Sequence, residues 1–281
     1  MAEPTAGTLD VPGLGALTAY RWGDDGPERP LVIVHGYAEH ALRHGRLAAA
    51  AAEAGHPVLA VDLPGHGRSP GERALVRSYA PLVAAVAAAV EDAASRDGER
   101  PALFGHSMGG AVALAYALDR PDALGRLVLS APYLLDAQPR PGWMKALARP
   151  VAALAPALPV AKLDAARLSR DPRVGEAYLA DPLVYSGPVK AATGHALTAA
   201  GPELLARAAA LAAPTLVLHG EADGVAAVEG SRRLAAAASA GTLALVTFPG
   251  AYHELHNEPE ETGVPERFVA AVLAFVRGGP D

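Results

Sequence analysis

Ser107, Asp223 and His253 are residues of the types that form a nucleophilic catalytic triad. A serine hydroxyl is a weak nucleophile at neutral pH, so it needs a base to take its proton and an acid to orient that base. The chain order is serine, acid, histidine, and each residue follows an apolar run of strand type. Glu221 and His256 are the neighbouring rivals for the acid and the base. We expect Asp223 and His253 to hold these roles.

The candidate nucleophile lies in the motif Gly-His-Ser-Met-Gly-Gly at 105–110, between an apolar run at 101–104 and a helical pattern at 108–119. In G-x-S-x-G the chain turns sharply from strand to helix, and the outer glycines remove side chains that would collide in the turn. The helix that begins near Met108 points its free N–H groups and its positive dipole end at Ser107. A tight turn with an incidental serine is the alternative, and the strand-before, helix-after context argues against it.

A second loop could supply the other hydrogen-bond donor that acyl transfer needs. One oxyanion donor is the N–H of the residue after the nucleophile, here Met108, and the other comes from a loop after an early strand. The sequence His-Gly-Tyr follows the apolar run 31–34, so we expect the Tyr37 N–H to be that second donor. The bulky Tyr37 side chain could also line the acyl site. The alternative is that this loop is only a tight turn.

Apolar runs of strand length alternate with helical patterns along most of the chain. The expected strands are 31–34, 57–61, 101–104, 126–130, 215–218 and 242–247, and the expected helices are 42–54, 79–95, 108–119, 228–239 and about 264–277. This alternation indicates parallel βαβ units in a doubly wound, mostly parallel sheet with helices on both faces. A G-x-S-x-G turn between a strand and a helix of such a sheet is typical of the α/β-hydrolase fold. Ligands bind at the carboxyl ends of the strands in such sheets, where Ser107, Asp223 and His253 would all lie.

The interval 132–200 breaks this alternation, because it is rich in proline and has little strand character. A loop of this length in a compact domain is usually functional or a subdomain. We therefore predict a helical cap, or lid, over 132–200, and an α/β-hydrolase core formed by 1–131 and 201–281. Apolar residues at 143–160 could contact a membrane or micelle surface transiently, or could pack onto the core, and both alternatives stay open.

The composition narrows the classes of partner. Hydrophobic residues make up 51% of the chain and charged residues 19%, enough for a large buried core. The net charge of −6, with no Lys/Arg cluster, argues against a nucleic-acid partner. The chain has no cysteine, so disulfides, thiolate metal sites and a cysteine nucleophile are excluded. Serine chemistry of the triad type needs no metal and no organic cofactor.

The first ten residues do not resemble a targeting signal. The segment MAEPTAGTLD has neither the basic nor the apolar part of a signal peptide. The most apolar stretch, 146–161, is too short and too interrupted by proline to span a bilayer. We therefore expect a soluble, cytoplasmic protein, and the oligomeric state stays open.

In this order the motifs resemble the monoacylglycerol lipase and lysophospholipase-like family of α/β-hydrolases. The stretches that carry the resemblance are HGYAEHALRH (35–44), DLPGHGRSPGER (62–73), GHSMGG (105–110), LDAARLSRDPRVGEAYLADPLVYSGPVKA (163–191), HGEAD (219–223) and AYHELHNE (251–258). The resemblance covers most of the chain. It implies a lid over an apolar acyl tunnel, with a small polar pocket for the glycerol head.

The family's head-group positions are occupied here by Glu39, Arg43, Tyr178 and His256, and carboxylate, guanidinium and imidazole groups can all hydrogen-bond a diol. Each residue has a plainer alternative. Glu39 and Arg43 could form a surface salt bridge or a helix-start pair. Tyr178 could pack within the cap, and His256 could be an ordinary loop residue.

The resemblance implies a serine hydrolase that cleaves carboxylic esters through an acyl-enzyme, with monoacylglycerols as the small lipid substrate. The chain departs from the family pattern at the large Tyr37 and over 132–162, which matches nothing that we can place. A general carboxylesterase, a lysophospholipase or a peptidase therefore stays open, as do an acyltransferase and a non-catalytic ligand-binding homologue. Haloalkane dehalogenase and epoxide hydrolase chemistry is disfavoured, because it would need an aspartate in place of Ser107.

Overall fold

An eight-stranded sheet forms the centre of the protein. The computed structural model describes residues 3–23, 26–97, 99–138 and 141–278. The strands of the sheet are β1 (Thr5–Val11), β2 (Gly15–Trp22), β3 (Leu31–Val34), β4 (Val58–Val61), β5 (Ala102–His106), β6 (Arg126–Ser130), β9 (Thr215–Gly220) and β10 (Leu243–Phe248). Their order is β1-β2-β4-β3-β5-β6-β9-β10. The pairs from β4 to β10 are parallel, and β2 joins β1 and β4 antiparallel.

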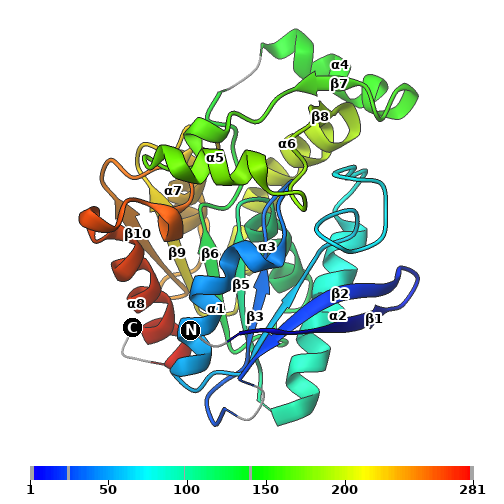
Figure 1. Ribbon diagram of the computed structural model, residues 1–281. Coiled ribbons are helices and arrows are strands. Elements are labelled where there is room, and N and C mark those ends of the chain that lie inside the picture. The colour runs from blue at the N-terminus through cyan, green and yellow to red at the C-terminus, as the bar shows by residue number, and fades with distance from the viewer. Residues whose placement is uncertain (1–2, 24–25, 98, 139–140, 279–281) are drawn as a thin grey trace.

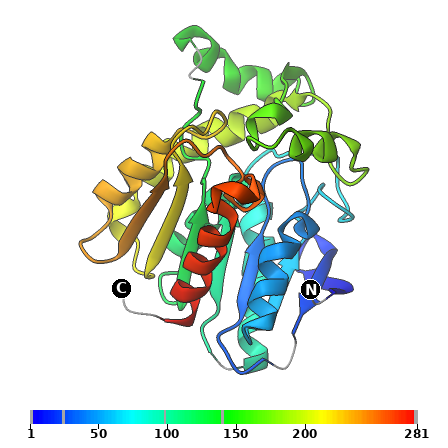
Figure 2. The same cartoon turned by 60° about the vertical axis from the view of Figure 1, so that its left-hand side comes forward.

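Helices cover both faces of this sheet. The helices are α1 (Gly45–Glu53), α2 (Ala80–Asp97), α3 (Met108–Asp119), α4 (Gly142–Leu154), α5 (Pro172–Ala180), α6 (Ala191–Ala206), α7 (Val228–Ala237) and α8 (Val264–Arg277). Figure 2 shows α8 (red) and α1 (blue) side by side in front of the sheet. The central strands β3, β4, β5 and β9 are buried along their whole length, as the continuous apolar runs predict, whereas the edge strands β1 and β10 carry exposed residues. The predicted α/β class, with a mostly parallel and doubly wound sheet, is confirmed.

Two hydrophobic cores result from the alternation of side chains along each strand. Leu31 and Ile33 of β3 pack into the core under α1 and α8, whereas Val32 and Val34 pack into the core under α2 and α3. The strands β5 and β9, which lead to Ser107 and Asp223, are thus fixed from both sides, whereas β10, which leads to His253, lies at the edge of the sheet beside β9.

The segment between β6 and β9 lies over the carboxyl ends of the strands (Figure 1). It contains α4, β7 (Pro159–Ala161), α5, β8 (Val189–Lys190) and α6, and β7 pairs antiparallel with β8. The predicted boundary at residue 200 falls inside α6, so the exact division into core and cap stays a prediction. We refer to residues 132–200 as the cap below. Within the described ranges, no helix has both the length and the apolar character to cross a membrane.

Short 3-10 helices complete the fold: η1 (Ala41–His44), η2 (Ala165–Arg167), η3 (Ala208–Ala210), η4 (Leu255–Asn257) and η5 (Glu260–Thr262). η1 and α1 replace the single helix expected over 42–54. η4 begins two residues after His253 and therefore lies close to that residue.

Candidate active site

Ser107 lies between the end of β5 and the start of α3, in a backbone conformation that non-glycine residues rarely adopt. Its φ is 54° and its ψ is −117°. Hydrogen bonds hold this strained turn, because the Ser107 N–H donates to the Ser130 carbonyl (2.9 Å) and the Ser107 carbonyl accepts from the Tyr133 N–H (2.9 Å). A Cβ at Gly105 would collide with the backbone of Gly109. Glycine is therefore required beside the serine, as the motif predicts.

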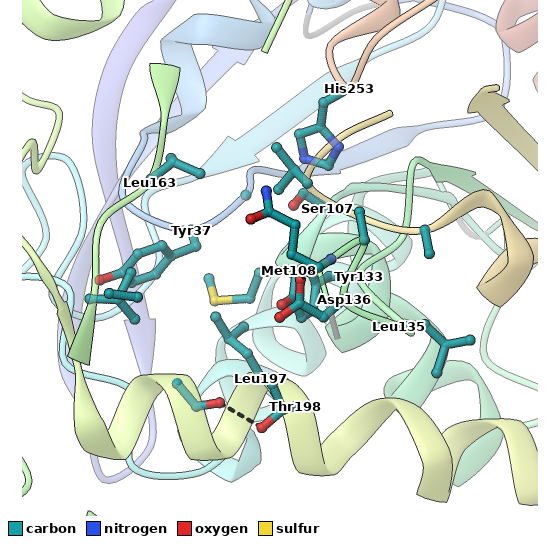
Figure 3. A pocket seen from close by; sticks show the side chains of 18 of the residues that line it. Tyr37, Ser107, Met108, Tyr133, Leu135, Asp136, Leu163, Leu197, Thr198 and His253 are labelled. Atoms are coloured by element: carbon teal, nitrogen blue, oxygen red, sulfur yellow. Dashed lines mark hydrogen bonds between the residues drawn. The ribbon is translucent and has the colours of Figure 1, made fainter. Parts of the chain in front are cut away.

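The Asp223 side chain joins His253 to this edge of the sheet. His253 Nδ1 donates to Asp223 Oδ2 at 2.6 Å. The other carboxylate oxygen accepts from the N–H groups of Val225 (2.7 Å) and Ala226 (3.0 Å). His253 and Ser107 line the same cavity, and both point into it in Figure 3. The structure thus brings the three residues predicted for a triad to one place.

Electrostatics fix the protonation of this pair. Burial raises the pKa of Asp223, but the nearby His253 and the hydrogen bonds from His219 and His253 outweigh burial and hold that pKa below its usual range. Burial lowers the pKa of His253, but the charge and hydrogen bond of Asp223, with the charges of Glu254 and Glu39, together outweigh burial and leave the pKa raised. Asp223 is therefore ionised, and His253 keeps a proton on Nδ1. His253 Nε2 is then the free nitrogen that can act as a base.

The predicted rivals lie elsewhere. Glu221 is partly exposed and accepts a hydrogen bond from the Thr247 hydroxyl at 2.8 Å. His256 packs against the rings of His44 (4.8 Å) and Phe268 (5.9 Å). Among the described residues, neither ring nitrogen of His256 has a hydrogen-bond partner. Of His253 and His256, only His253 contacts Asp223.

The two candidate oxyanion donors lie on either side of Ser107. A Cβ added at Gly36 would come within 3.2 Å of the Ser107 Cβ, so this loop lies directly against the nucleophile. Among the described residues, the N–H groups of Tyr37 and Met108 donate to no protein carbonyl. Both residues line the cavity (Figure 3). The Tyr37 hydroxyl donates to the Ala74 carbonyl at 3.3 Å, which fixes the bulky ring at the cavity wall.

The cavity has a volume of about 1100 Å³ and lies between the core and the cap. Its cap wall is largely apolar and includes Met144, Leu147 and Val151 of α4 and Leu197 of α6. Ser107 and His253 lie where the core loops form the wall. The space is large enough for an acyl chain whose carbonyl would reach Ser107.

A family model supplies the identification. The model of "Serine aminopeptidase, S33" matches residues 25–260, which is most of the chain. The chain belongs to this family. It has the α/β-hydrolase fold, and its similarity to relatives named monoacylglycerol or monoglyceride lipase makes it a serine ester hydrolase.

Several known proteins are similar to this chain over most of its length. A protein of Mycolicibacterium smegmatis named monoacylglycerol lipase is 40% identical over 239 residues, 85% of each chain. The human monoglyceride lipase is 34% identical and aligns with 86% of this chain and 81% of its own. The crystal structure of the Paleococcus ferrophilus monoacylglycerol lipase superposes with a TM-score of 0.82 at 34% identity, covering 92% of this chain and 98% of that one.

Of the four residues at the family's head-group positions, two line the cavity of this hydrolase and two do not. Glu39 and Tyr178 line the cavity, whereas Arg43 and His256 lie behind its wall. Glu39 and Arg43 do form a pair, with Nε to Oε2 at 2.9 Å, but this pair is buried rather than on the surface. The Arg43 guanidinium stacks on the Tyr178 ring, 4.9 Å from its centroid. The Tyr178 hydroxyl has no partner among the described residues.

Two residues of the site were not found by sequence reasoning. His219 Nε2 lies 3.1 Å from the Asp223 carboxylate. Glu254 lines the cavity next to His253, and both of its oxygens accept from one Nη of Arg43, at 2.8 and 2.6 Å. A carboxylate beside the candidate base is a signal that could have drawn attention to Glu254. Its partner is far away in the sequence, so the pairing itself leaves no pattern.

Proposed function

We propose that this enzyme hydrolyses monoacylglycerols to glycerol and a fatty acid through an acyl-enzyme on Ser107. The observation that carries the proposal is the position of Ser107 and the Asp223–His253 pair on a large, mainly apolar cavity with a polar catalytic end. The similarity to relatives named monoacylglycerol or monoglyceride lipase supports the same substrate.

In the first half of the reaction, Ser107 Oγ attacks the ester carbonyl while His253 Nε2 takes the hydroxyl proton. The Asp223 carboxylate stabilises the imidazolium that forms. The N–H groups of Tyr37 and Met108 donate to the oxyanion of the tetrahedral intermediate. Collapse of the intermediate breaks the ester bond, and His253 returns the proton to the leaving glycerol oxygen.

In the second half, water takes the place of the alcohol. His253 removes a proton from the water as it attacks the acyl carbonyl, and the second tetrahedral intermediate is held by the same two N–H groups. The bond to Ser107 Oγ then breaks, and the serine regains its proton from His253. The fatty acid leaves and the enzyme returns to its starting state.

The polarity of the cavity suits a monoacylglycerol. The acyl chain would lie along the apolar wall of α4 and α6, away from Ser107. The two free hydroxyls of glycerol would lie near Glu39 and Tyr178, whose side chains line the cavity. The unpartnered Tyr178 hydroxyl gains a hydrogen bond when a substrate hydroxyl reaches it.

The cap could also bring the enzyme to its lipid. Leu154 and Leu158 are exposed and do not line the cavity, and Leu154 is 87% exposed. Transient contact of these side chains with a membrane or micelle surface would place the cavity close to the interface where monoacylglycerols reside.

A hydrolysis series tests the proposal. Purified enzyme and a Ser107→Ala control are assayed with mono-, di- and triacylglycerols of one acyl chain, with a lysophospholipid, and with 4-nitrophenyl esters of increasing length. We expect a higher kcat/KM for monoacylglycerol than for the other natural lipids, and loss of all activities in the control. Preference for simple short esters, or for the lysophospholipid, would reject the proposed substrate and leave a carboxylesterase or a lysophospholipase.

A further inference from the structure

We propose that Arg43 and Glu254 are positioning residues, which together tie the loop of His253 to the loop of the second oxyanion donor. This role differs from the glycerol contact that the family resemblance implies for Arg43. The inference builds on the proposed ester hydrolysis, but it does not depend on which alcohol leaves.

The tie is a continuous line of charge-assisted hydrogen bonds. The backbone N–H of Gly36, next to Tyr37, donates to Glu39 Oε1 at 2.5 Å. Arg43 Nε donates to Glu39 Oε2 at 2.9 Å, and an Arg43 Nη donates to both oxygens of Glu254. Glu254 follows His253 in the chain. The oxyanion loop and the base are thus joined by one guanidinium.

Burial makes these bonds strong. The side chains of Arg43, Glu39 and Glu254 are 10%, 3% and 2% exposed. Ion pairs shielded from water lose little to screening, and a guanidinium that holds two carboxylates fixes their separation and angle. Arg43 also stacks on the Tyr178 ring, so its plane is held from a third side. Arg43 Nε and one Nη already donate to carboxylates.

The far end of this line reaches the cap. The Glu254 N–H donates to the Leu168 carbonyl at 2.7 Å, and Asn257 Nδ2 donates to Glu254 Oε2 at 2.7 Å. Glu254 is therefore held through its backbone by the cap and through its side chain by Arg43. A shift of this residue would move His253 relative to Ser107 and to the two oxyanion N–H groups.

A geometric role predicts a loss of turnover that is independent of the alcohol. Small displacements of reacting groups can cost about a hundredfold in rate. The Glu254→Gln variant keeps the shape of the side chain and leaves Arg43 paired with Glu39, so no buried charge loses its only partner. Arg43→Lys keeps the charge but removes the planar fork that holds two carboxylates at once.

A matched control pair lies a few residues further along the chain from Arg43 and from Glu254. Arg46 of α1 and Glu260 of η5 form an ion pair that joins these segments at the surface, where Glu260 is 64% exposed. Glu260→Gln therefore removes a similar tie without touching the cavity. Exposed ion pairs of this kind contribute little to the stability of the fold.

The experiment measures kcat and KM for wild type, Glu254→Gln, Arg43→Lys and Glu260→Gln, each with 4-nitrophenyl acetate and with a monoacylglycerol. Thermal unfolding and active-site titration normalise the rates to folded enzyme. We expect kcat of the first two variants to fall roughly ten- to hundredfold on both esters, with KM nearly unchanged. We expect Glu260→Gln to match the wild type.

Three results would overturn the inference. Wild-type kcat in Glu254→Gln would do so, and so would a rise in KM confined to the monoacylglycerol, which is the mark of a glycerol contact. A fall equal to that in Glu260→Gln would indicate only a general loss of stability. The nitrophenyl ester reports on positioning even if monoacylglycerols prove to be poor substrates, so failure of the substrate proposal is recognised separately.

Discussion

His219 Nε2 lies 3.1 Å from Asp223 Oδ2, the same oxygen that accepts from His253. That nitrogen also lies 3.0 Å from the carbonyl oxygen of Ala226. Both neighbours are acceptors, so we assign the proton of His219 to Nε2. Nδ1 then accepts from the Ser231 hydroxyl at 2.7 Å. The carboxylate that orients the base is itself oriented by a second, fully buried histidine.

Replacing His219 tests this orientation. In His219→Leu the carboxylate loses a donor, and we expect kcat/KM to fall about tenfold, the equivalent of one hydrogen bond to a charged group. His219→Gln can still donate from its amide and should retain more activity. Steady-state kinetics of both variants give the answer. Wild-type activity in the His219→Leu variant would show that the backbone N–H groups of Val225 and Ala226 suffice.

The acid limb of the pH–rate profile reports on His253. The imidazole must be neutral to accept the proton of Ser107, so kcat/KM is lost as pH falls through its pKa. Since the Asp223 carboxylate raises that pKa, the half-maximal point should lie above about 6.5, the value for a free imidazole. In Asp223→Asn the limb should move to lower pH, and kcat should fall by roughly 10⁴.

Glu221→Gln is the control for that profile, because Glu221 bonds Thr247 and not His253. This variant should keep the acid limb of the wild-type pH–rate profile. An acid limb at or below about 6.5 in the wild type would contradict the assigned role of the Asp223 charge.

The apolar wall of the cavity should set the acyl-chain length. Val151 of α4 lines the cavity, and Val151→Trp would fill part of its 1100 Å³. We expect kcat/KM for long-chain 4-nitrophenyl esters to fall at least tenfold while that for the acetate stays within about twofold. Val151→Ala is the matched enlargement and should favour long chains. An equal effect of the tryptophan on all chain lengths would place the acyl chain elsewhere.

Gly109 should be intolerant of any side chain. A Cβ there would collide with the carbonyl oxygens of Val34 and His35, which belong to a buried strand end and the oxyanion loop. We expect Gly109→Ala to lower the free energy of unfolding by about 1–3 kcal/mol and to reduce kcat. Gly142→Ala is the comparison, since nothing lies within 4 Å of a Cβ at that residue. Denaturant unfolding measures both.

Sequence reasoning reached the fold because every central strand is a continuous apolar run. It missed β1 and β2, whose mixture of exposed and buried residues gives a weaker pattern. It also missed α6, which contains Gly194, Gly201 and Pro202 and forms where it packs against α3, α4 and α7. Tertiary contacts of that kind override the low helix propensity of the segment.

The candidate triad could be predicted because its residues follow strand ends that a parallel sheet brings to one edge. The contacts of the residues around the triad could not be predicted. Arg43 could face the cavity or pair with Glu254. Which of the two occurs depends on the packing of Tyr178 and the cap, and no local sequence pattern encodes that packing. The same is true of His219, whose role depends on the turn at Val225 and Ala226.

The nucleophile is tested most directly by covalent labelling. Purified enzyme is treated with a fluorophosphonate, and intact and peptide mass spectrometry locate the adduct while activity is followed in parallel. We predict one adduct per chain, on Ser107, that forms at the rate at which ester hydrolysis is lost and is absent from Ser107→Ala. Loss of activity with the label on another residue, or full labelling of Ser107 with hydrolysis intact, would contradict the account.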